Sequence, residues 1–135
     1  MAQLTVLVVE DDVLVRLTAA EYLRETGDSV IEAANASEAL SVFASGQEVD
    51  VVFTDVQMPG AMDGLILARW VRKHHPETEL LITSGKGDDA VSSGLIARDA
   101  FFPKPYRIGA VAAHIRASAQ GLQNHAVYER RSSAL

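Results

Sequence analysis

The sequence predicts an α/β fold in which helices cover both faces of a parallel β-sheet. Segments typical of strands alternate along the chain with segments of helical periodicity, which is the order of elements expected for such a sheet. The first strand, expected over residues 4–9, is apolar throughout, as strands buried on both faces are. It is therefore expected at the centre of the sheet.

A helix over residues 13–25 is expected next, and it ends before Gly27 because glycine is common just after a helix. Its residues at helical spacing are Val15, Ala19, Tyr22 and Leu23. Residues 29–33 are less apolar and predict a second strand nearer the edge of the sheet. The helix after it, which ends at residue 43, can begin at Asn35 or at Ser37, since either side chain can cap a helix.

The later elements are strands at residues 49–54, 80–83 and 100–102, and helices at residues 63–75, 88–97 and 107–119. Pro76 ends the first of these helices. The second contains Ser92-Ser93-Gly94, which are weak helix formers, so we expect it to be the least rigid element. Gly121 is expected to interrupt the last helix, and the tail over residues 121–135 to be loosely ordered.

Composition indicates one soluble domain, which we expect over residues 1–120. The chain has 135 residues, of which 48% are hydrophobic and 22% charged. No segment reaches the ~20 apolar residues of a membrane helix, and the start lacks the basic region of a secretory signal. We therefore expect a cytoplasmic protein, without a membrane partner, that is a monomer or a weak homodimer.

The charge balance excludes other classes of protein. A net charge of −6 argues against a domain that holds nucleic acid by neutralising its phosphates. The absence of cysteine excludes disulfides, a thiol nucleophile and a zinc-thiolate site. The basic run at residues 72–75 is more typical of a solvated helix C-terminus than of a binding site.

Polar side chains follow four of the expected strands at their carboxyl ends. Asp55 follows the strand over residues 49–54, and Glu10-Asp11-Asp12 follows the first strand. Ser84 follows the fourth strand, and Pro103-Lys104-Pro105 follows the fifth. Because the carboxyl ends of parallel strands meet at one edge of a sheet, where ligands of open α/β sheets bind, we expect acids, a hydroxyl and a lysine in one crevice.

These groups favour phosphoryl chemistry supported by a metal ion. Neighbouring carboxylates repel one another, and a hard divalent cation such as Mg²⁺ relieves the repulsion. Zinc fits less well, because none of the four histidines lies near these strand ends. The carboxylate of Asp55 can attack phosphorus to give an acyl phosphate if the metal and Lys104 offset the developing charge. Ser84 can donate a hydrogen bond to another phosphoryl oxygen.

Four motifs in this order resemble those of the response regulator receiver domain. They are Val8-Val9-Glu10-Asp11, Asp55 with Met58-Pro59-Gly60, Thr83-Ser84-Gly85 and Lys104-Pro105, and the likeness spans roughly residues 3–120. The resemblance implies a (βα)5 domain with the flavodoxin-like strand order 2-1-3-4-5. It also implies a bacterial two-component protein that takes a phosphoryl group from a histidine kinase or a phosphotransfer protein.

The resemblance assigns roles to the acidic residues. Asp55 matches the phosphorylated aspartate, Asp11 the direct magnesium ligand, and Glu10 the acid that usually holds magnesium through water. We take Glu10-Asp11 as the acidic pair because Arg16 then falls where the first helix of the family often has arginine. Asp12 is then expected to be an additional surface acid.

Further roles follow from the same resemblance. The backbone carbonyl of Gln57 matches the third protein ligand of magnesium, Ser84 the switch hydroxyl, and Lys104 the phosphate-binding lysine, whose bond to Pro105 is cis in most relatives. Phe101 stands where many receivers have tyrosine, and it is either a switching side chain or a fixed core aromatic. The loop over residues 58–64 looks one residue longer than usual, as in receivers attached to or partnered with hybrid histidine kinases.

Such a domain signals through protein contacts and is not a turnover enzyme. Phosphorylation of Asp55 is expected to draw Ser84 toward the phosphoryl group and to change the face formed by the fourth helix, fifth strand and fifth helix. Because no output domain follows, we expect a stand-alone regulator read by a separate, unidentified protein. Two alternatives stay open. One is a receiver-like interaction module that is not phosphorylated, and the other is a haloacid dehalogenase-type phosphatase, which needs Asp-x-Asp after the first strand.

Overall fold

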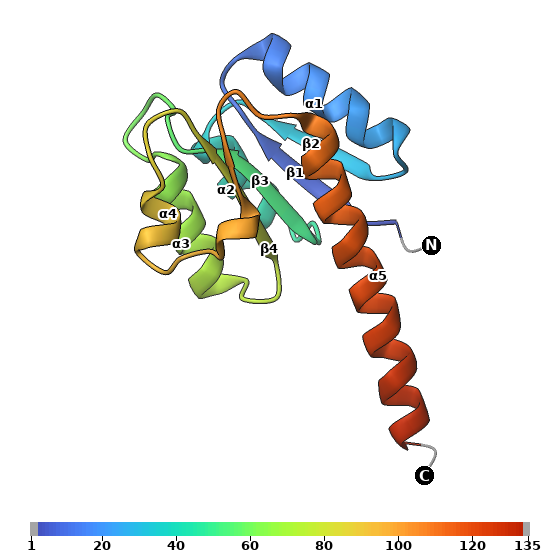
Figure 1. Cartoon of the computed structure of the whole chain (residues 1–135). Coiled ribbons are helices and arrows are strands. Elements are labelled where there is room, and N and C mark those ends of the chain that lie inside the picture. The colour runs from blue at the N-terminus through green and yellow to red at the C-terminus, as the bar shows by residue number, and fades with distance from the viewer. Residues whose placement is uncertain (1–2, 134–135) are drawn as a thin grey trace.

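Five parallel strands form one sheet in the order β2-β1-β3-β4-β5, which confirms the predicted topology (Figure 1). The computed structural model describes the backbone of residues 3–133 and the side chains of residues 3–121. The strands are β1 (Thr5–Val9), β2 (Ser29–Ala33), β3 (Val51–Asp55), β4 (Glu79–Ser84) and β5 (Phe101–Pro103). Residues Val9 and Thr54 are partners in register, as are Asp55 and Thr83, so the carboxyl ends of the central strands are level with one another.

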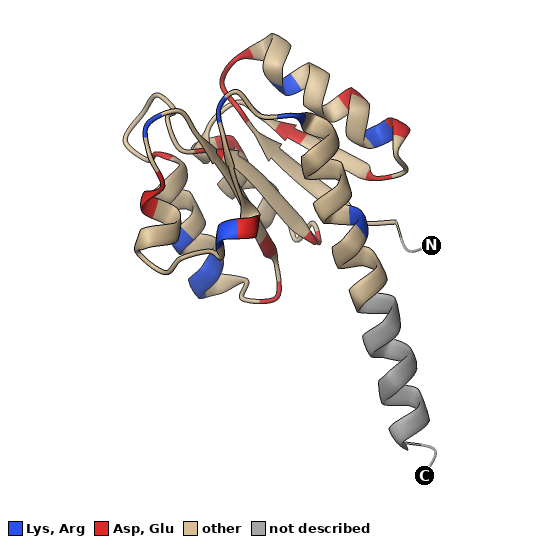
Figure 2. Ribbon diagram, viewed as in Figure 1, with Lys and Arg blue, Asp and Glu red and all other residues tan. Residues whose placement is uncertain are grey.

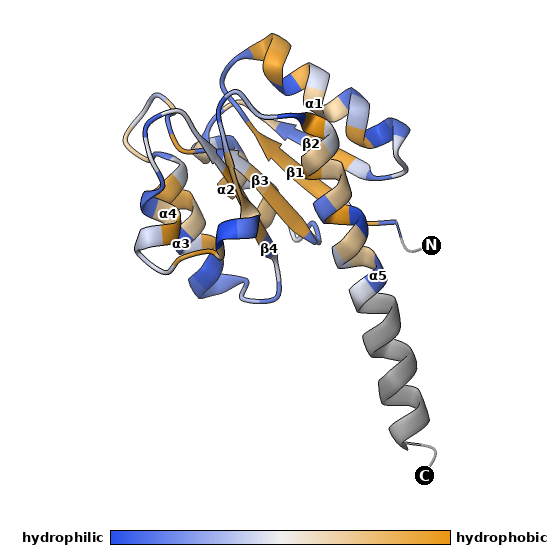
Figure 3. Ribbon diagram, in the orientation of Figure 1, coloured by the Kyte–Doolittle hydropathy of each residue, from blue (hydrophilic) through white to orange (hydrophobic). Residues whose placement is uncertain are grey.

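Helices cover both faces of the sheet. Figure 1 shows α1 (Val13–Glu25) and α5 (Ile108–Ser133) on one side, and α2 (Ala36–Ala44), α3 (Gly64–His74) and the short α4 (Asp89–Ser92) on the other. The central strands are fully buried between these layers, and they are hydrophobic in Figure 3 and almost free of charge in Figure 2. Among the described residues, none of the helices combines the length and the apolar character needed to span a membrane.

Side-chain caps fix where three helices begin. Asn35, not Ser37, caps α2, because its Oδ1 accepts a hydrogen bond of 2.9 Å from the Glu38 amide. Asp63 caps α3 in the same way. Asp12 is a surface acid as predicted, and it also caps α1 by accepting from the Val15 amide at 3.0 Å. Each cap of this kind contributes about 1 kcal/mol.

The inward face of α1 is narrower than predicted. Ala19 and Leu23 are buried as expected, but Val15 and Tyr22 are exposed by 37% and 39%. The buried residues of α1 are Ala19, Ala20 and Leu23, whereas Val15 and Tyr22 lie at the margin of this buried face. Tyr22 instead lies beside Gly109 of α5, where an added Cβ would be 3.3 Å from the Tyr22 hydroxyl oxygen.

The predicted helix over residues 88–97 is wrong in length, because α4 ends at Ser92. Gly94 adopts a positive φ of 80°, which favours glycine and closes the helix. A short 3-10 helix, η1 (Arg98–Ala100), then leads into β5. The weak helix formers in this segment therefore shorten the helix, and its low rigidity stays a prediction.

The last helix is longer than predicted. It was expected to end at residue 119, yet α5 continues through Gly121 to Ser133. One glycine inside a helix costs only about 1 kcal/mol, which is too little to end it. The side chains from residue 122 onward lie outside the described residues, so the domain limit at residue 120 and the loosely ordered tail stay predictions.

Candidate functional site

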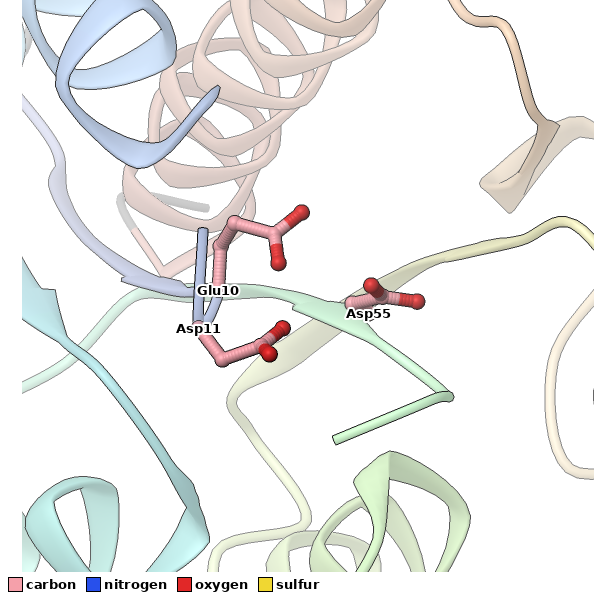
Figure 4. Close-up of side chains that lie close together, drawn as sticks. All are labelled: Glu10, Asp11 and Asp55. Carbon is pink, nitrogen blue, oxygen red and sulfur yellow. The ribbon is translucent and has the colours of Figure 1, made fainter. Parts of the chain in front are cut away.

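Three carboxylates meet where β1 and β3 end. Glu10 and Asp11 directly follow β1, and Asp55 is the last residue of β3. Because these strands are neighbours in register, their ends bring the acids together, and one carboxylate oxygen from each acid lies within 4.8 Å of the other two. Figure 4 shows the three side chains turned toward a common space. Glu10 and Asp55 are buried, whereas Asp11 is exposed to solvent.

Lys104 reaches this cluster from the end of β5. Its Nζ lies 2.6 Å from Asp55 Oδ2 and 3.8 Å from Glu10 Oε1. Burial alone would lower the pKa of Lys104, but the hydrogen bond and charge of Asp55, with the charges of Glu10 and Asp11, raise it above its ordinary value. Lys104 is therefore a cation at neutral pH. Its bond to Pro105 is cis, as the family resemblance implied.

The surroundings of Glu10 raise the pKa of its carboxyl group. Burial, a hydrogen bond with Asp11 and the charge of Asp55 raise its pKa to about 7, against the lowering effects of the Asp12 amide and Lys104. Arg16 supports the same turn, because its guanidinium donates to the Glu10 carbonyl at 2.7 Å. Burial is the largest of these effects, and the cluster sets three carboxyl groups against the single ammonium of Lys104, an excess of acidic groups over that cation.

That excess charge fits a hard divalent cation. Oxygen ligands at this spacing suit Mg²⁺, which binds carboxylates and completes its shell with backbone oxygen, water or phosphoryl oxygen. The residues that would hold the ion are Asp11 and Asp55, with Glu10 beside them and the backbone carbonyl of Gln57 as the predicted further ligand. The acidic pocket that receiver domains use for Mg²⁺ is thus present in this chain.

We expect Glu10→Gln to stabilise the metal-free protein in a pH-dependent manner. The raised pKa means that deprotonating Glu10 costs more in the folded than in the unfolded chain, so wild-type stability falls as the pH rises from 4.5 to about 7. Glutamine does not titrate. The variant should gain about 1–2 kcal/mol in the free energy of unfolding above pH 7, after allowance for screening, and the gain should vanish below pH 4.5.

Urea unfolding in a metal chelator at a series of pH values measures this difference. Glu48→Gln, which changes an exposed carboxylate in the α2–β3 loop, is the matched control and should show no such trend. A stability gain of equal size at every pH would contradict the explanation, because it would not arise from the titration of Glu10.

Ser84 is buried at the end of β4 beside the acidic cluster, and its neighbour Thr83 is the strand partner of Asp55. The Ser84 hydroxyl oxygen accepts hydrogen bonds from Gln57 Nε2 at 2.9 Å and from the Lys86 amide at 3.1 Å. The Gln57 amide in turn donates to Asp55 Oδ1 at 3.1 Å. The sequence analysis assigned the backbone carbonyl of Gln57 to the metal, and no motif predicted the contact of its side chain with Ser84.

Phe101 is the partner of Ile82 in the pairing of β4 with β5. It is half-buried at the start of β5 and borders a cavity of about 500 Å³ that Ser84, Gly85 and Lys104 also line. The cavity gives a side chain or a loop room to move. Both roles of Phe101, a switching side chain and a fixed core aromatic, stay predictions.

An apolar groove borders the site on the α1 side. Its volume is about 610 Å³, and its lining includes Leu14, Lys104 and Tyr106. Leu14 is 74% exposed, so an apolar side chain lies at the surface of the groove that Lys104 also lines. Tyr106 was missed by the sequence analysis, although it directly follows Pro105. Burial and the charges of Glu10 and Asp55 raise its pKa to about 12, which keeps its hydroxyl neutral.

A doubly wound parallel sheet with an acidic pocket and a lysine at its carboxyl edge defines a receiver-type α/β domain. Residues 6–116 match the model of the response regulator receiver domain, and the chain belongs to this family of two-component signalling domains. The predicted family and fold class are thereby confirmed.

Relatives of known name carry the same unit. The chain is 40% identical over 115 residues to the sensor kinase CckA of Brucella abortus, covering 83% of this chain and 12% of that protein. It is 30% identical over 107 residues to a cyclic di-GMP phosphodiesterase of Thermotoga maritima, covering 78% of this chain and 28% of that protein. The chain thus spans about a third or less of the length of these relatives.

Solved structures agree with the fold. A response regulator receiver protein from Pseudomonas putida superposes with a TM-score of 0.76 at 27% identity, covering 87% of this chain and 98% of that chain. NtrX from Brucella abortus gives a TM-score of 0.75 at 28% identity over 94% of this chain and 30% of that chain. The receiver domain of an HD domain-containing protein from Pseudomonas fluorescens gives 0.78 at 23% identity, over 91% and 99% of the two chains.

Proposed function

We propose that this receiver domain accepts a phosphoryl group on Asp55 from a phosphohistidine of a histidine kinase or phosphotransfer protein, in a Mg²⁺-dependent reaction. The observation that carries the proposal is the contact of 2.6 Å between Lys104 Nζ and Asp55 Oδ2, inside a cluster of three carboxylates. A buried nucleophile, a fixed cation and oxygen ligands for a metal are the groups that phosphoryl transfer needs.

In the proposed transfer, a carboxylate oxygen of Asp55 forms a bond to phosphorus while the bond from phosphorus to the donor's imidazole nitrogen breaks. The electron pair of that bond leaves with the imidazole, which then takes up a proton. Lys104 stabilises the charge that develops on the phosphoryl oxygens. Bound Mg²⁺ would supply further compensation of charge at the same oxygens. Asp55 is only 3% exposed, so the surrounding residues exclude most water from the nucleophile.

The signal would leave through a change of shape rather than through a product. Ser84 is expected to turn its hydroxyl to the phosphoryl group, and the loop after β4 and the short α4 would follow it. If the phosphoryl group favours the active arrangement over the resting one by ~5.5 kcal/mol, the ratio of active to resting protein already changes from 1:99 to 99:1. The face formed by α4, β5 and α5 would then be read by a separate protein in the cytoplasm.

Intact mass after incubation with Mg²⁺ and acetyl phosphate tests the proposal. The wild type should gain the mass of one phosphoryl group, and Asp55→Asn should gain none, because an amide is not a nucleophile toward phosphorus. Asp89→Asn, which changes an exposed aspartate of α4, should be phosphorylated as the wild type is. An unmodified wild type would favour the interaction-module alternative, and equal labelling of Asp55→Asn would place the phosphoryl group elsewhere.

Two further expectations, the absence of phosphatase turnover and the stand-alone arrangement, stay predictions. The chain has Glu10-Asp11-Asp12 after β1 and not the Asp-x-Asp motif of the haloacid dehalogenase phosphatases, so a phosphomonoester should not be turned over steadily. A stand-alone regulator was expected, but the relatives named above carry this unit within much longer chains. The proposal therefore concerns the receiver unit itself.

A further inference from the structure

Gln57 connects the loop after β3 to the loop after β4. Its side-chain Nε2 donates a hydrogen bond to Ser84 Oγ at 2.9 Å, and its Oε1 accepts one from the Gly85 amide at 3.2 Å. Its backbone amide donates to Asp55 Oδ1 at 3.1 Å. One residue thus contacts the phosphoacceptor through its backbone and the start of the β4–α4 loop through its side chain.

The orientation of the Gln57 amide follows from its partners. A backbone N–H can only donate, so the atom that faces the Gly85 amide must be the oxygen, and the nitrogen must then face Ser84. Ser84 Oγ also accepts from the Lys86 amide, so both of its lone pairs are used. The buried Ser84 hydroxyl is therefore held in one place from two sides.

We propose that the side chain of Gln57 is a latch that holds the β4–α4 loop in its resting arrangement and releases it when Ser84 turns to a phosphoryl group on Asp55. The release of the loop in this proposal rests on the proposed function, the phosphorylation of Asp55. Gln57 is a positioning residue in this proposal, because it acts through Ser84 and Gly85. Since its contacts exist in the resting arrangement, they oppose the switch, and removing them should favour the phosphorylated arrangement.

The surroundings of the loop support a latch. A cavity of about 500 Å³ that Ser84, Gly85 and Gly87 line, and Gln57 does not, leaves open space beside the loop. The short α4 that follows carries only four residues and adds little resistance to movement. The contacts of Gln57 thus restrain the start of a loop that has room to move, and the ion pair of Asp88 with Arg98 holds its other end.

Hydrogen exchange in the unphosphorylated protein tests the resting contact. Gln57→Met keeps the length of the side chain but removes both polar atoms, and the Gly85 amide should then exchange about fivefold faster, as expected for the loss of one ordinary hydrogen bond. Gln47→Met is the control, because Gln47 is exposed and, among the residues whose side chains are described, its side chain donates to the neighbouring Glu48 carbonyl. Unchanged exchange of Gly85 in Gln57→Met would overturn the proposal.

Binding of beryllium fluoride with Mg²⁺, as a stand-in for the phosphoryl group, tests the release. Gln57→Met should bind it about fivefold more tightly than the wild type and Gln47→Met do. Equal or weaker binding would overturn the latch, because Gln57 would then not oppose the switch. If none of the three proteins binds beryllium fluoride, the proposed function fails, whereas the exchange of Gly85 still decides the contact in the resting protein.

Discussion

Lys104→Met is expected to lower the rate of Asp55 phosphorylation by acetyl phosphate about 100-fold, the usual loss when one preorganised donor to a developing oxyanion is removed. Methionine keeps the aliphatic part of the side chain, whose Cδ would lie 3.8 Å from a Cβ added at Gly85. It removes the ammonium that lies 2.6 Å from Asp55 Oδ2. The effect should therefore arise from charge and not from lost packing.

The rate is measured by intact mass over time at saturating Mg²⁺. Lys73→Met, which removes an exposed lysine near the end of α3, should leave the rate unchanged. Asp11, which lies within the acidic cluster, is untouched in the variant, so binding of Mg²⁺ should persist. A Lys104→Met protein that is phosphorylated as fast as the wild type would show that the charge on the phosphoryl oxygens is balanced elsewhere, and the assigned role of Lys104 would be wrong.

Gly64→Ala should cause the largest loss of stability of any single methyl group added to this domain's glycines. The Cβ would lie 1.9 Å from the Asp55 carbonyl oxygen and 2.8 Å from Val56 Cα, both of which are backbone atoms that cannot turn aside. The Gly64 amide also donates to the Val56 carbonyl at 2.9 Å, which ties α3 to the end of β3. Relief of the clash requires the first turn of α3 or the end of β3 to move.

We expect this substitution to lower the free energy of unfolding by about 3 kcal/mol, at the upper end of the usual cost of overpacking. Gly121→Ala is the matched control, because nothing lies within 4 Å of its added Cβ and it stands within α5. That change should stabilise the protein by about 0.5–1 kcal/mol, since alanine is the better helix former. Urea unfolding measures both, and equal stabilities of the two variants would contradict the close contact seen at Gly64.

Much of the fold followed from local patterns. The apolar strand over residues 4–9 predicted its own place at the centre, because only a strand covered on both faces can be apolar throughout. The order of strands came from the family resemblance and is confirmed. Helix lengths were less predictable. Gly94 was expected inside a helix but follows its end, whereas Gly121 was expected to interrupt a helix but lies within α5. A glycine ends a helix where its backbone takes a positive φ, as at Gly94, and its low helix propensity alone is not enough.

The candidate site, like the fold, was predictable from the sequence only in part. The meeting of Glu10, Asp11, Asp55 and Lys104 could be expected from the sequence, because each residue stands at the carboxyl end of a parallel strand and these ends share one edge of the sheet. The strand pattern and the strand-end residues thus determined which chemical groups come together. Only the tertiary structure decided that Gln57 holds Ser84 and that Gly64 lies against Asp55. Such contacts join side chains and backbone atoms whose fit depends on differences of less than an ångström between elements, and no local pattern of residue types encodes a distance of that kind.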